Sequence, residues 1–315
     1  MPTFAIITPV FNGIHFLRGM RNALEKQTVK DFEWIIINDG SNDATPKDYE
    51  KILEGLSFPK KIFHIENVGQ GMARNIGISE SIAPWICTID VDDIPYANKI
   101  ETIMQLIENY SEKQAIIGAH ALIIVGKNRR IAQFIVPFAF SNDNKTRIVE
   151  IKKHFKRTSN PFPASGVFFS RRLLDATGIK YLEDRKLIGT EDYIFNMTAL
   201  KVADEIVVTD KVCGTYLEHA NNISKPTFGF FQKTISALVS TAEDLDFKEE
   251  LPWAIANICI LNMFSVRFRN RKFVMDMLNC GVKRGGLFVV ICAFFQILLS
   301  KITSFCKTLK LNYLK

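Results

Sequence analysis

The sequence has few cysteines, and none of them form a closely spaced pair. Its six cysteines include no C-x-x-C motif, and several lie in apolar stretches. Zinc modules and disulfide-stapled secreted domains both depend on regularly spaced cysteines. We therefore expect reduced, buried thiols in a cytosolic protein, with neither a structural zinc site nor a disulfide framework.

Glycine and proline are also sparse, at 17 and 11 of 315 residues, while 47% of the residues are hydrophobic. This composition excludes extensive disorder and predicts a globular protein of one large or two modest domains. The first residues, MPTFAIITPVF, lack the basic start and the small-residue cleavage site of a secretory signal. We expect the protein to stay in the cytosol.

Acidic residues are nearly absent from the last part of the chain. Residues 251–315 hold ten Lys or Arg and one acid, Asp276, although the net charge of the whole chain is only +7. A basic segment of this kind indicates which partners the protein binds and says little about its fold. We predict two domains, residues 1–225 and a basic, helical C-terminal module at residues 226–315.

Short apolar runs alternate with helical patterns over the first 110 residues. Apolar runs at 4–7, 32–37, 62–65 and 85–89 predict buried strands, and helical spacing follows them at 14–24, 46–56, 72–81 and 98–110. Four strand and helix pairs with short connections predict an α/β fold. Its sheet is doubly wound, mostly parallel and flanked by helices.

Beyond residue 114 the pattern is less regular. Strands are predicted at 115–125, 131–136, 166–169, 205–209 and 212–217, and helices at 171–177 and 191–202. Residues 138–147 read as a polar loop. After Pro226 only helical patterns remain, at 228–247, 251–268 and 272–280, which predict a C-terminal helical extension.

Three carboxylates end the fourth predicted strand: Asp90, Asp92 and Asp93 in the stretch WICTIDVDDIP. Open α/β sheets bind their ligands at the carboxyl ends of strands. Clustered carboxylates repel one another unless a cation lies among them, and oxygen ligands suit Mg²⁺ or Mn²⁺. An acidic loop that caps the next helix would explain the same residues, so the choice depends on the rest of the chain.

Three other segments lead to the same edge of the predicted sheet. Two are turns, TPVFN after the first strand and NDGS after the second, and each alone is an ordinary turn. The third, NVGQGMARNIGI, opens a helix whose N-terminus and Arg74 would favour a diphosphate. It is not G-x-G-x-x-G and does not follow the first strand, which makes a Rossmann dinucleotide fold a weak alternative.

The motifs TPVFN, DGS, NVGQGMARNIGI, DVDD and TEDYIF occur in this order. In this order and spacing they resemble the family 2 glycosyltransferases of the GT-A fold, over roughly residues 3–225. No single motif is specific, but the ordered set is. The resemblance implies inverting transfer of a sugar from a nucleotide-sugar donor, usually a UDP sugar, to an acceptor hydroxyl.

The resemblance also implies roles for single residues. It assigns the base and ribose of the donor to Pro9, Phe11 and Asp39, with Asn12, Gly40, Ser41 and Gly69 in the same donor-binding loops. It places Arg74 near the donor and Asp90 towards the ribose. The D-x-D pair Asp90 and Asp92 would bind the metal, with Asp92 the stronger ligand, and His219 would lie near the metal and the diphosphate.

The acid pair Glu191 and Asp192 matches the catalytic acids of the family, with Asp192 as the general base. A carboxylate opposite the leaving diphosphate can take the proton of the incoming hydroxyl. Mn²⁺ or Mg²⁺ bound by Asp92 would neutralise the charge that develops on the diphosphate. Both residues also have a purely structural interpretation. Asp192 would then be an acid that stabilises a helix N-terminus, and His219 an ordinary surface or core histidine.

Two departures from the family pattern bear on base recognition and on the type of transfer. The frequent acid pair before Gly-Ser is here Asn38 and Asp39, so base recognition would depend on Asp39 alone. The Q-x-x-R-W motif of processive polysaccharide synthases is absent from the sequence. We therefore expect addition of a single sugar, in the assembly of a cell-surface glycan on a glycan or lipid-linked acceptor.

Residues 286–306 are apolar on one side and carry basic flanks. The apolar run at 287–299 is shorter than the roughly 20 residues that span a bilayer. We expect an interfacial helix that binds the inner face of the cell membrane peripherally, with a spanning helix or a homo-oligomer contact as alternatives. A nucleic-acid partner is not expected, because no binding module accompanies the basic residues.

Two other functions fit parts of the sequence. A metal-dependent nucleotidyltransferase also uses carboxylates and a glycine-bearing loop, and a non-catalytic nucleotide-sugar-binding scaffold would need no base. The sequence does not assign the sugar, the nucleotide, the acceptor, the linkage or the oligomeric state.

Overall fold

The computed structural model describes residues 1–108, 113–125, 130–134, 142–157, 162, 164–184, 189–219 and 228–257. Its contacts divide the chain into two compact units. The first comprises residues 1–148 and 160–223, and the second comprises residues 149–159 and the chain from residue 224 onward. The predicted domain boundary after residue 225 remains a prediction.

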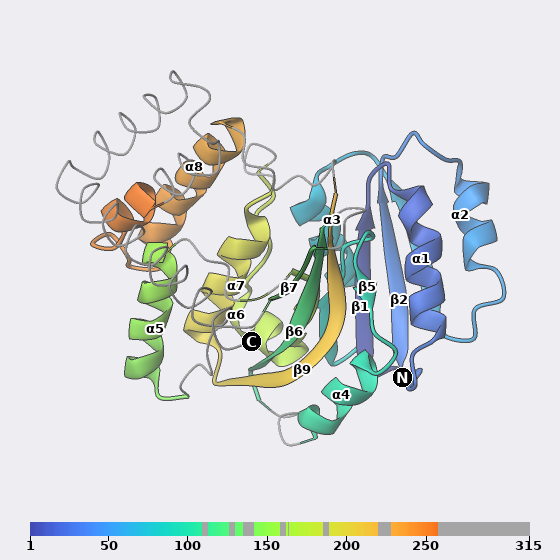
Figure 1. The fold of residues 1–315 in the computed structure, drawn as a ribbon, viewed down its shortest axis with the longest axis horizontal. Helices are drawn as coiled ribbons and strands as arrows, with labels where there is room; N and C mark the ends of the chain where they lie inside the picture. Colours follow the sequence, from blue (N-terminus) through green and yellow to red (C-terminus); the bar gives the residue numbers. More distant parts are fainter. Residues whose placement is uncertain are drawn as a thin grey trace, which may run out of the picture. The chain divides into compact units, whose positions relative to one another are not determined.

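Four parallel strands form one half of the sheet in the order β3-β2-β1-β4. These are β1 (Phe4–Val10), β2 (Phe32–Asp39), β3 (Lys60–Ile65) and β4 (Trp85–Thr88). The helices between and after them are α1 (Ile14–Glu25), α2 (Pro46–Leu53), α3 (Gln70–Glu80) and α4 (Lys99–Ile107). The strand and helix alternation predicted for this region is confirmed, and α1 and α2 lie side by side (Figure 1).

The sheet continues beyond β4 with a change of direction. β8 (Val167–Ser170) runs antiparallel to both β4 and β6 (Ala115–Val125), and β9 (Glu205–Glu218) runs parallel to β6. The edge strands β5 (Ile94–Pro95) and β7 (Arg130–Phe134) pair with β9 and β6. Around them lie the short 3-10 helix η1 (Ala164–Gly166), α6 (Arg171–Thr177) and α7 (Glu191–Val202). The predicted mixed α/β fold is confirmed.

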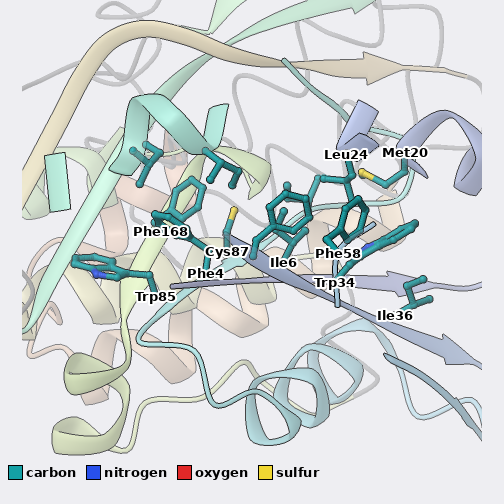
Figure 2. Close-up of a cluster of buried hydrophobic side chains, with 14 of the residues drawn as sticks. Phe4, Ile6, Met20, Leu24, Trp34, Ile36, Phe58, Trp85, Cys87 and Phe168 are labelled. Atoms are coloured by element: carbon teal, nitrogen blue, oxygen red, sulfur yellow. The ribbon is translucent and has the colours of Figure 1, made fainter. Parts of the chain in front are cut away.

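The core of this unit follows from strands that are apolar on both faces. Alternate residues point to opposite sides of a strand, so Phe4 and Ile6 join the buried cluster that contains Met20 and Leu24 of α1 (Figure 2). The other face of β1 meets α3, where Gly77 lies directly against Ile7. Burying one such large side chain contributes about 1.5–3 kcal/mol. Both faces of β1 are therefore packed, and the loop at its carboxyl end begins from a buried strand.

Two predictions about secondary structure were wrong. Residues 205–209 and 212–217 belong to one strand, β9, because a register irregularity near Ala119 and His120 lets β6 pair with it on both sides of the break. Part of the polar loop predicted at 138–147 is the start of α5 (Asn144–Arg157). The buried residues of this helix recur every fourth position at Arg147, Ile151 and Phe155, and the arginine obscures the apolar pattern.

The described part of the second unit is helical. It contains α8 (Phe228–Asp244) and a helical segment at 251–257, and the rings of Phe155 and Phe247 pack edge to face at 5.4 Å. No helix within the described ranges is long and apolar enough to cross a membrane. The predicted helix at 251–268 is helical over its described part, residues 251–257. The rest of it, the predicted helix at 272–280 and the amphipathic segment at 286–306 lie outside the described residues.

Candidate active site

The loops after β1 and β2 are tied together at the carboxyl edge of the sheet. The Asn12 N–H donates to Ser41 Oγ at 3.0 Å, and the Ser41 hydroxyl donates to the Val10 carbonyl at 3.3 Å. The Tyr49 hydroxyl donates to the same Ser41 oxygen at 3.2 Å. Asn12 adopts a left-handed backbone conformation, with φ of 51°, which Asn tolerates better than most residues.

Asp39 joins these two loops to the start of α3. Its carboxylate is buried and accepts the backbone N–H groups of Val68 at 2.6 Å and Gly69 at 3.0 Å. Gly40 lies where a Cβ atom would come within 2.6 Å of the Asn67 nitrogen, so only glycine fits this turn. The three predicted donor-binding loops therefore meet at one place.

The remaining predicted donor residues flank this junction. Pro9 is buried in β1 and lies opposite Ile37 of β2, whereas Phe11 is 56% exposed just beyond β1. Asn38, which replaces the frequent acid, lies beside His64, with Nδ2 and Nδ1 2.9 Å apart. The Asn38 Oδ1 accepts the Ser41 N–H at 3.0 Å, so this amide shapes the turn that carries Asp39.

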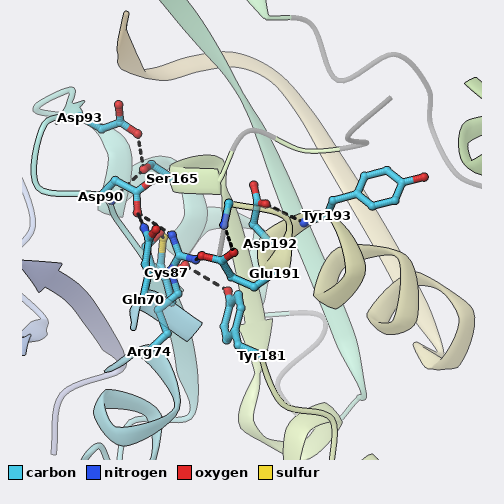
Figure 3. Close-up of polar contacts among 12 residues, drawn as sticks. Gln70, Arg74, Cys87, Asp90, Asp93, Ser165, Tyr181, Glu191, Asp192 and Tyr193 are labelled. Atoms are coloured by element: carbon cyan, nitrogen blue, oxygen red, sulfur yellow. Dashed lines mark hydrogen bonds and ion pairs between the residues drawn. The ribbon is translucent and has the colours of Figure 1, made fainter. Parts of the chain in front are cut away.

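Arg74 links the D-x-D turn to the start of α7. Its Nη2 donates to Asp90 Oδ1 at 2.7 Å, and its Nη1 donates to Glu191 Oε1 at 3.4 Å (Figure 3). Gln70 also donates to Asp90 Oδ1, and the Gly189 N–H donates to Glu191 Oε2 at 2.5 Å. Burial lowers the pKa of Arg74, but the surrounding acidic groups, with Asp90 the strongest, outweigh burial and raise the pKa, so the guanidinium stays charged.

Arg74 packs against two stacked aromatic rings, Tyr181 and Phe195. The guanidinium lies 5.2 Å from the ring centre of Tyr181, and this ring stacks on Phe195 of α7 at 3.9 Å. The Tyr181 hydroxyl lies 3.2 Å from Thr88 Oγ1 at the end of β4. A Cβ at Gly71 would come within 2.0 Å of the Leu182 carbonyl oxygen, so α3 and the Tyr181 segment lie in direct contact.

Asp192 lies in the first turn of α7, immediately after Glu191. Its Oδ1 accepts the N–H of Tyr193 at 2.8 Å. Burial and the charge on Glu191 together raise the pKa of Asp192 to about 6, although the charge on Arg74 opposes them. A carboxylate with this pKa is ionised near neutral pH and is a stronger base than an exposed one.

Asp92 and His219 come together from the D-x-D turn and the end of β9. Asp92 Oδ2 and His219 Nε2 are 2.8 Å apart, and the His219 ring packs on Phe16 of α1 with centres 5.0 Å apart. Burial raises the pKa of Asp92, and Asp90 adds to this, while His219 opposes it. Within the described ranges, no three His, Cys, Asp or Glu side chains form a cluster that could hold a metal.

Asp93 has other partners than this pair. It is buried, and its Oδ2 accepts the Ser165 hydroxyl (Figure 3). Its Oδ1 accepts the Leu217 N–H at 3.3 Å. Burial and the charge on Asp90 raise its pKa well above the usual range. The three acids at the end of β4 thus face different partners: Asp90 faces Arg74, Asp92 faces His219, and Asp93 faces Ser165.

Sequence reasoning missed several residues that shape this site, chiefly Phe16, Tyr49, Ser165 and Tyr181. None of them lies in a motif. Phe16, Ser165 and Tyr181 act through contacts with distant segments of the chain, and Tyr49 reaches back from α2 to Ser41. The one signal was the position of Phe16 in the predicted helix, three residues after Gly13 and so close to the carboxyl edge of the sheet.

Comparisons with known proteins agree with this architecture. The family model described as "Glycosyl transferase family 2" matches residues 5–175. An uncharacterized glycosyltransferase of Rickettsia bellii is 35% identical over 150 residues, which is 47% of this chain and only 21% of that protein. The uncharacterized glycosyltransferase EpsJ of Bacillus subtilis is 25% identical over 282 residues, covering 82% of this chain and 79% of EpsJ.

Solved structures share the fold at low identity. S. aureus TarS 1-349 in complex with UDP-GlcNAc has a TM-score of 0.65 at 17% identity, covering 92% of this chain and 83% of that one. The mannosyltransferase PcManGT from Pyrobaculum calidifontis, in complex with GDP-Man and Mn2+, has a TM-score of 0.55 at 14% identity, covering 95% and 80%. The fold is GT-A, and the chain belongs to glycosyl transferase family 2.

Proposed function

We propose that this protein is an inverting glycosyltransferase that transfers a single sugar from a nucleotide-sugar donor to an acceptor hydroxyl. The observation that carries the proposal is the Asp90, Arg74 and Glu191 network, which connects the donor-side turn to the helix that bears Asp192. A transferase needs its donor site and its base held at a fixed separation. A binding scaffold has no need of such a connection.

The proposed donor is a UDP sugar. The Asp39 carboxylate is fixed by two backbone N–H groups, and a carboxylate has about four acceptor positions. It can therefore accept one more N–H, such as that of a uracil ring. Phe11, exposed beside it, offers a ring for stacking on the base. TarS has been crystallised with UDP-GlcNAc and with UDP, which supports this choice.

Mn²⁺ or Mg²⁺ is the proposed cofactor, held by Asp92 and His219. A carboxylate and an imidazole 2.8 Å apart suit a divalent cation, whose other ligands would be diphosphate oxygens and water. Bound there, the cation would stabilise charge on the leaving diphosphate. Asp90 is a weaker candidate ligand, because its Oδ1 already accepts from Arg74 and Gln70.

Asp192 is the proposed general base. It would take the proton of the acceptor hydroxyl as that oxygen attacks the anomeric carbon from the face opposite the diphosphate. Glu191, also predicted to be catalytic, is buried with both oxygens engaged by Arg74 and Gly189. We therefore assign Glu191 to holding Arg74 in place.

The acceptor is proposed to be a glycan or a lipid-linked glycan at the inner face of the cell membrane. The support is the basic C-terminal module, with ten Lys or Arg against one acid in residues 251–315. Flotation with anionic liposomes should carry the full-length protein upward, and a chain ended near Arg284 should stay at the bottom. Equal flotation of both proteins would contradict the membrane role.

The transfer itself is tested by screening UDP sugars for release of UDP, with Mn²⁺ present and then omitted. We expect metal-dependent release of UDP from one donor, and loss of at least about 100-fold in rate for Asp192→Asn. Release of pyrophosphate would instead indicate a nucleotidyltransferase. Tight donor binding with no turnover of any donor would favour the scaffold.

A further inference from the structure

We infer that Ser165 is a positioning residue for the Asp92 and His219 pair. The inference rests on the proposed metal-dependent function, and it concerns a residue that no motif identifies. Ser165 lies in η1, a short turn just before β8 that is remote in sequence from both ligands. Its hydroxyl nevertheless lies at the point where the two ligand-bearing segments meet.

Ser165 fixes the D-x-D turn from one side. Its Oγ accepts the Asp90 N–H at 3.0 Å, and its O–H donates to Asp93 Oδ2 (Figure 3). The Asp93 N–H donates to the Asp90 carbonyl at 3.0 Å, which closes the turn. Asp92 lies between these two residues, so the hydroxyl holds both ends of the turn that presents its carboxylate.

The same hydrogen-bonded group reaches the segment that bears His219. Asp93 Oδ1 accepts the N–H of Leu217 at 3.3 Å, two residues before the histidine. The turn and the end of β9 are thereby joined through one buried carboxylate whose other oxygen is held by Ser165. The 2.8 Å separation of Asp92 and His219 depends on that junction, because each ligand extends from one of the two joined segments.

Ser165 is itself firmly anchored. Its carbonyl accepts the Lys99 ammonium at 2.5 Å, and Lys99 is buried with its charge 5.4 Å from the ring centre of Phe168. Loss of the hydroxyl would therefore move the turn rather than η1. The Asp90 N–H and the Asp93 carboxylate would each lose a hydrogen-bond partner away from solvent. An unsatisfied buried polar group is costly, so the turn should rearrange to form new hydrogen bonds.

Ser170 provides a matched control in the same part of the fold. It is also buried, and its Oγ accepts the N–H groups of Ala115 at 2.9 Å and Leu173 at 3.3 Å. Ser170→Ala therefore removes a hydroxyl with a similar number of hydrogen bonds, but Ala115 and Leu173 lie outside the D-x-D turn. A purely structural role for Ser165 would make the two alanine variants alike.

The test measures Mn²⁺ binding directly, by electron paramagnetic resonance of free Mn²⁺ titrated with full-length protein in the presence of UDP. We expect Ser165→Ala to weaken Mn²⁺ binding about tenfold, the usual scale for residues that orient metal ligands. Ser170→Ala should bind Mn²⁺ within about twofold of the wild type, and Ser165→Thr, which keeps the hydroxyl, should bind more tightly than Ser165→Ala. Thermal unfolding midpoints of all variants give the stability change separately.

The outcomes distinguish this inference from the proposed function. Wild-type protein that binds no Mn²⁺ with UDP would contradict the metal-dependent function and the inference together. Wild-type binding that Ser165→Ala leaves unchanged would overturn the inference alone. Equal weakening in Ser165→Ala and Ser170→Ala would also overturn it, because general destabilisation would then suffice.

Discussion

Arg74 and Asp90 form an ion pair at 2.7 Å, and the same guanidinium also reaches Glu191 at 3.4 Å. One buried cation thus connects the end of β4 with the start of α7. These segments are about a hundred residues apart in the chain, and each carries an acid that the proposed reaction uses. The arginine therefore acts as a structural connection between the donor side and the base.

Replacing Arg74 by an uncharged residue should lower the free energy of unfolding. Arg74→Met leaves Glu191, which is only 4% exposed, without its counter-ion, and breaking a buried pair in this way costs about 3–5 kcal/mol. We expect urea unfolding to show a loss of that order. Arg21→Met is the control, because its pair with Glu25 is 27% and 34% exposed, and its hydrogen bond to the Glu54 carbonyl at 3.0 Å is exposed as well. Their loss should cost about 1 kcal/mol. Equal losses in both variants would contradict the assigned role.

The sequence allowed the parallel half of the sheet to be predicted because its strands are continuous apolar runs. The grouping of Asp39, Arg74 and Asp90 followed, since parallel strands end at one edge. The sequence could not predict the contacts of residues that lie in no motif and in no hydrophobic pattern. Tyr181 meets Arg74 only because a segment without regular structure crosses α3, and Ser165 meets Asp93 only because β8 returns beside β4.

The start of α5 shows a second limit of sequence reasoning. Arg147 is buried and donates to the Asp204 carbonyl at 3.4 Å, so a charged residue occupies a position that an apolar one would normally take. Hydropathy patterns treat such a residue as exposed. The loop predicted at 138–147 therefore overlaps the first residues of α5, although the buried positions of this helix have helical spacing.

The pH dependence of turnover tests the base. Asp192 must be ionised to accept a proton, and its pKa is raised to about 6. The rate should rise with pH through about 6 and level off above it, falling about tenfold per pH unit below the pKa. A kcat/KM profile at saturating Mn²⁺ measures this. Persistence of the same rising limb in Asp192→Asn would show that another group is responsible.

Glu191→Gln should move that rising limb to lower pH. The charge on Glu191 raises the pKa of Asp192, and Arg74 lowers it. Replacing the carboxylate by an amide removes the first effect and leaves the second, so the pKa of Asp192 falls. The same kcat/KM profile detects the shift. A limb that stays in place or moves to higher pH would contradict the electrostatic coupling between the two acids.

Gly71→Ala should destabilise the protein. A Cβ at this position would lie 2.0 Å from the Leu182 carbonyl, so α3 and the segment that carries Tyr181 must separate. Overpacking of this kind costs about 1–3 kcal/mol. Gly19→Ala is the matched control, because its Cβ would meet only Ile94 at 3.6 Å, and it should stabilise α1 by about 0.5–1 kcal/mol. Thermal midpoints that move in the same direction would contradict this packing.

His219→Ala should raise the Mn²⁺ concentration needed for half-maximal turnover by about tenfold or more, because the imidazole is one of two proposed protein ligands. His15→Ala is the control. His15 is exposed and packs on the same Phe16 ring, with centres 4.0 Å apart, but makes no contact with Asp92 among the described interactions. It should leave the Mn²⁺ requirement within about twofold of the wild type. If both variants shift the requirement equally, the aromatic packing around Phe16 matters rather than ligation. If neither does, His219 is not a metal ligand, and the proposed protein ligands are Asp92 and, more weakly, Asp90.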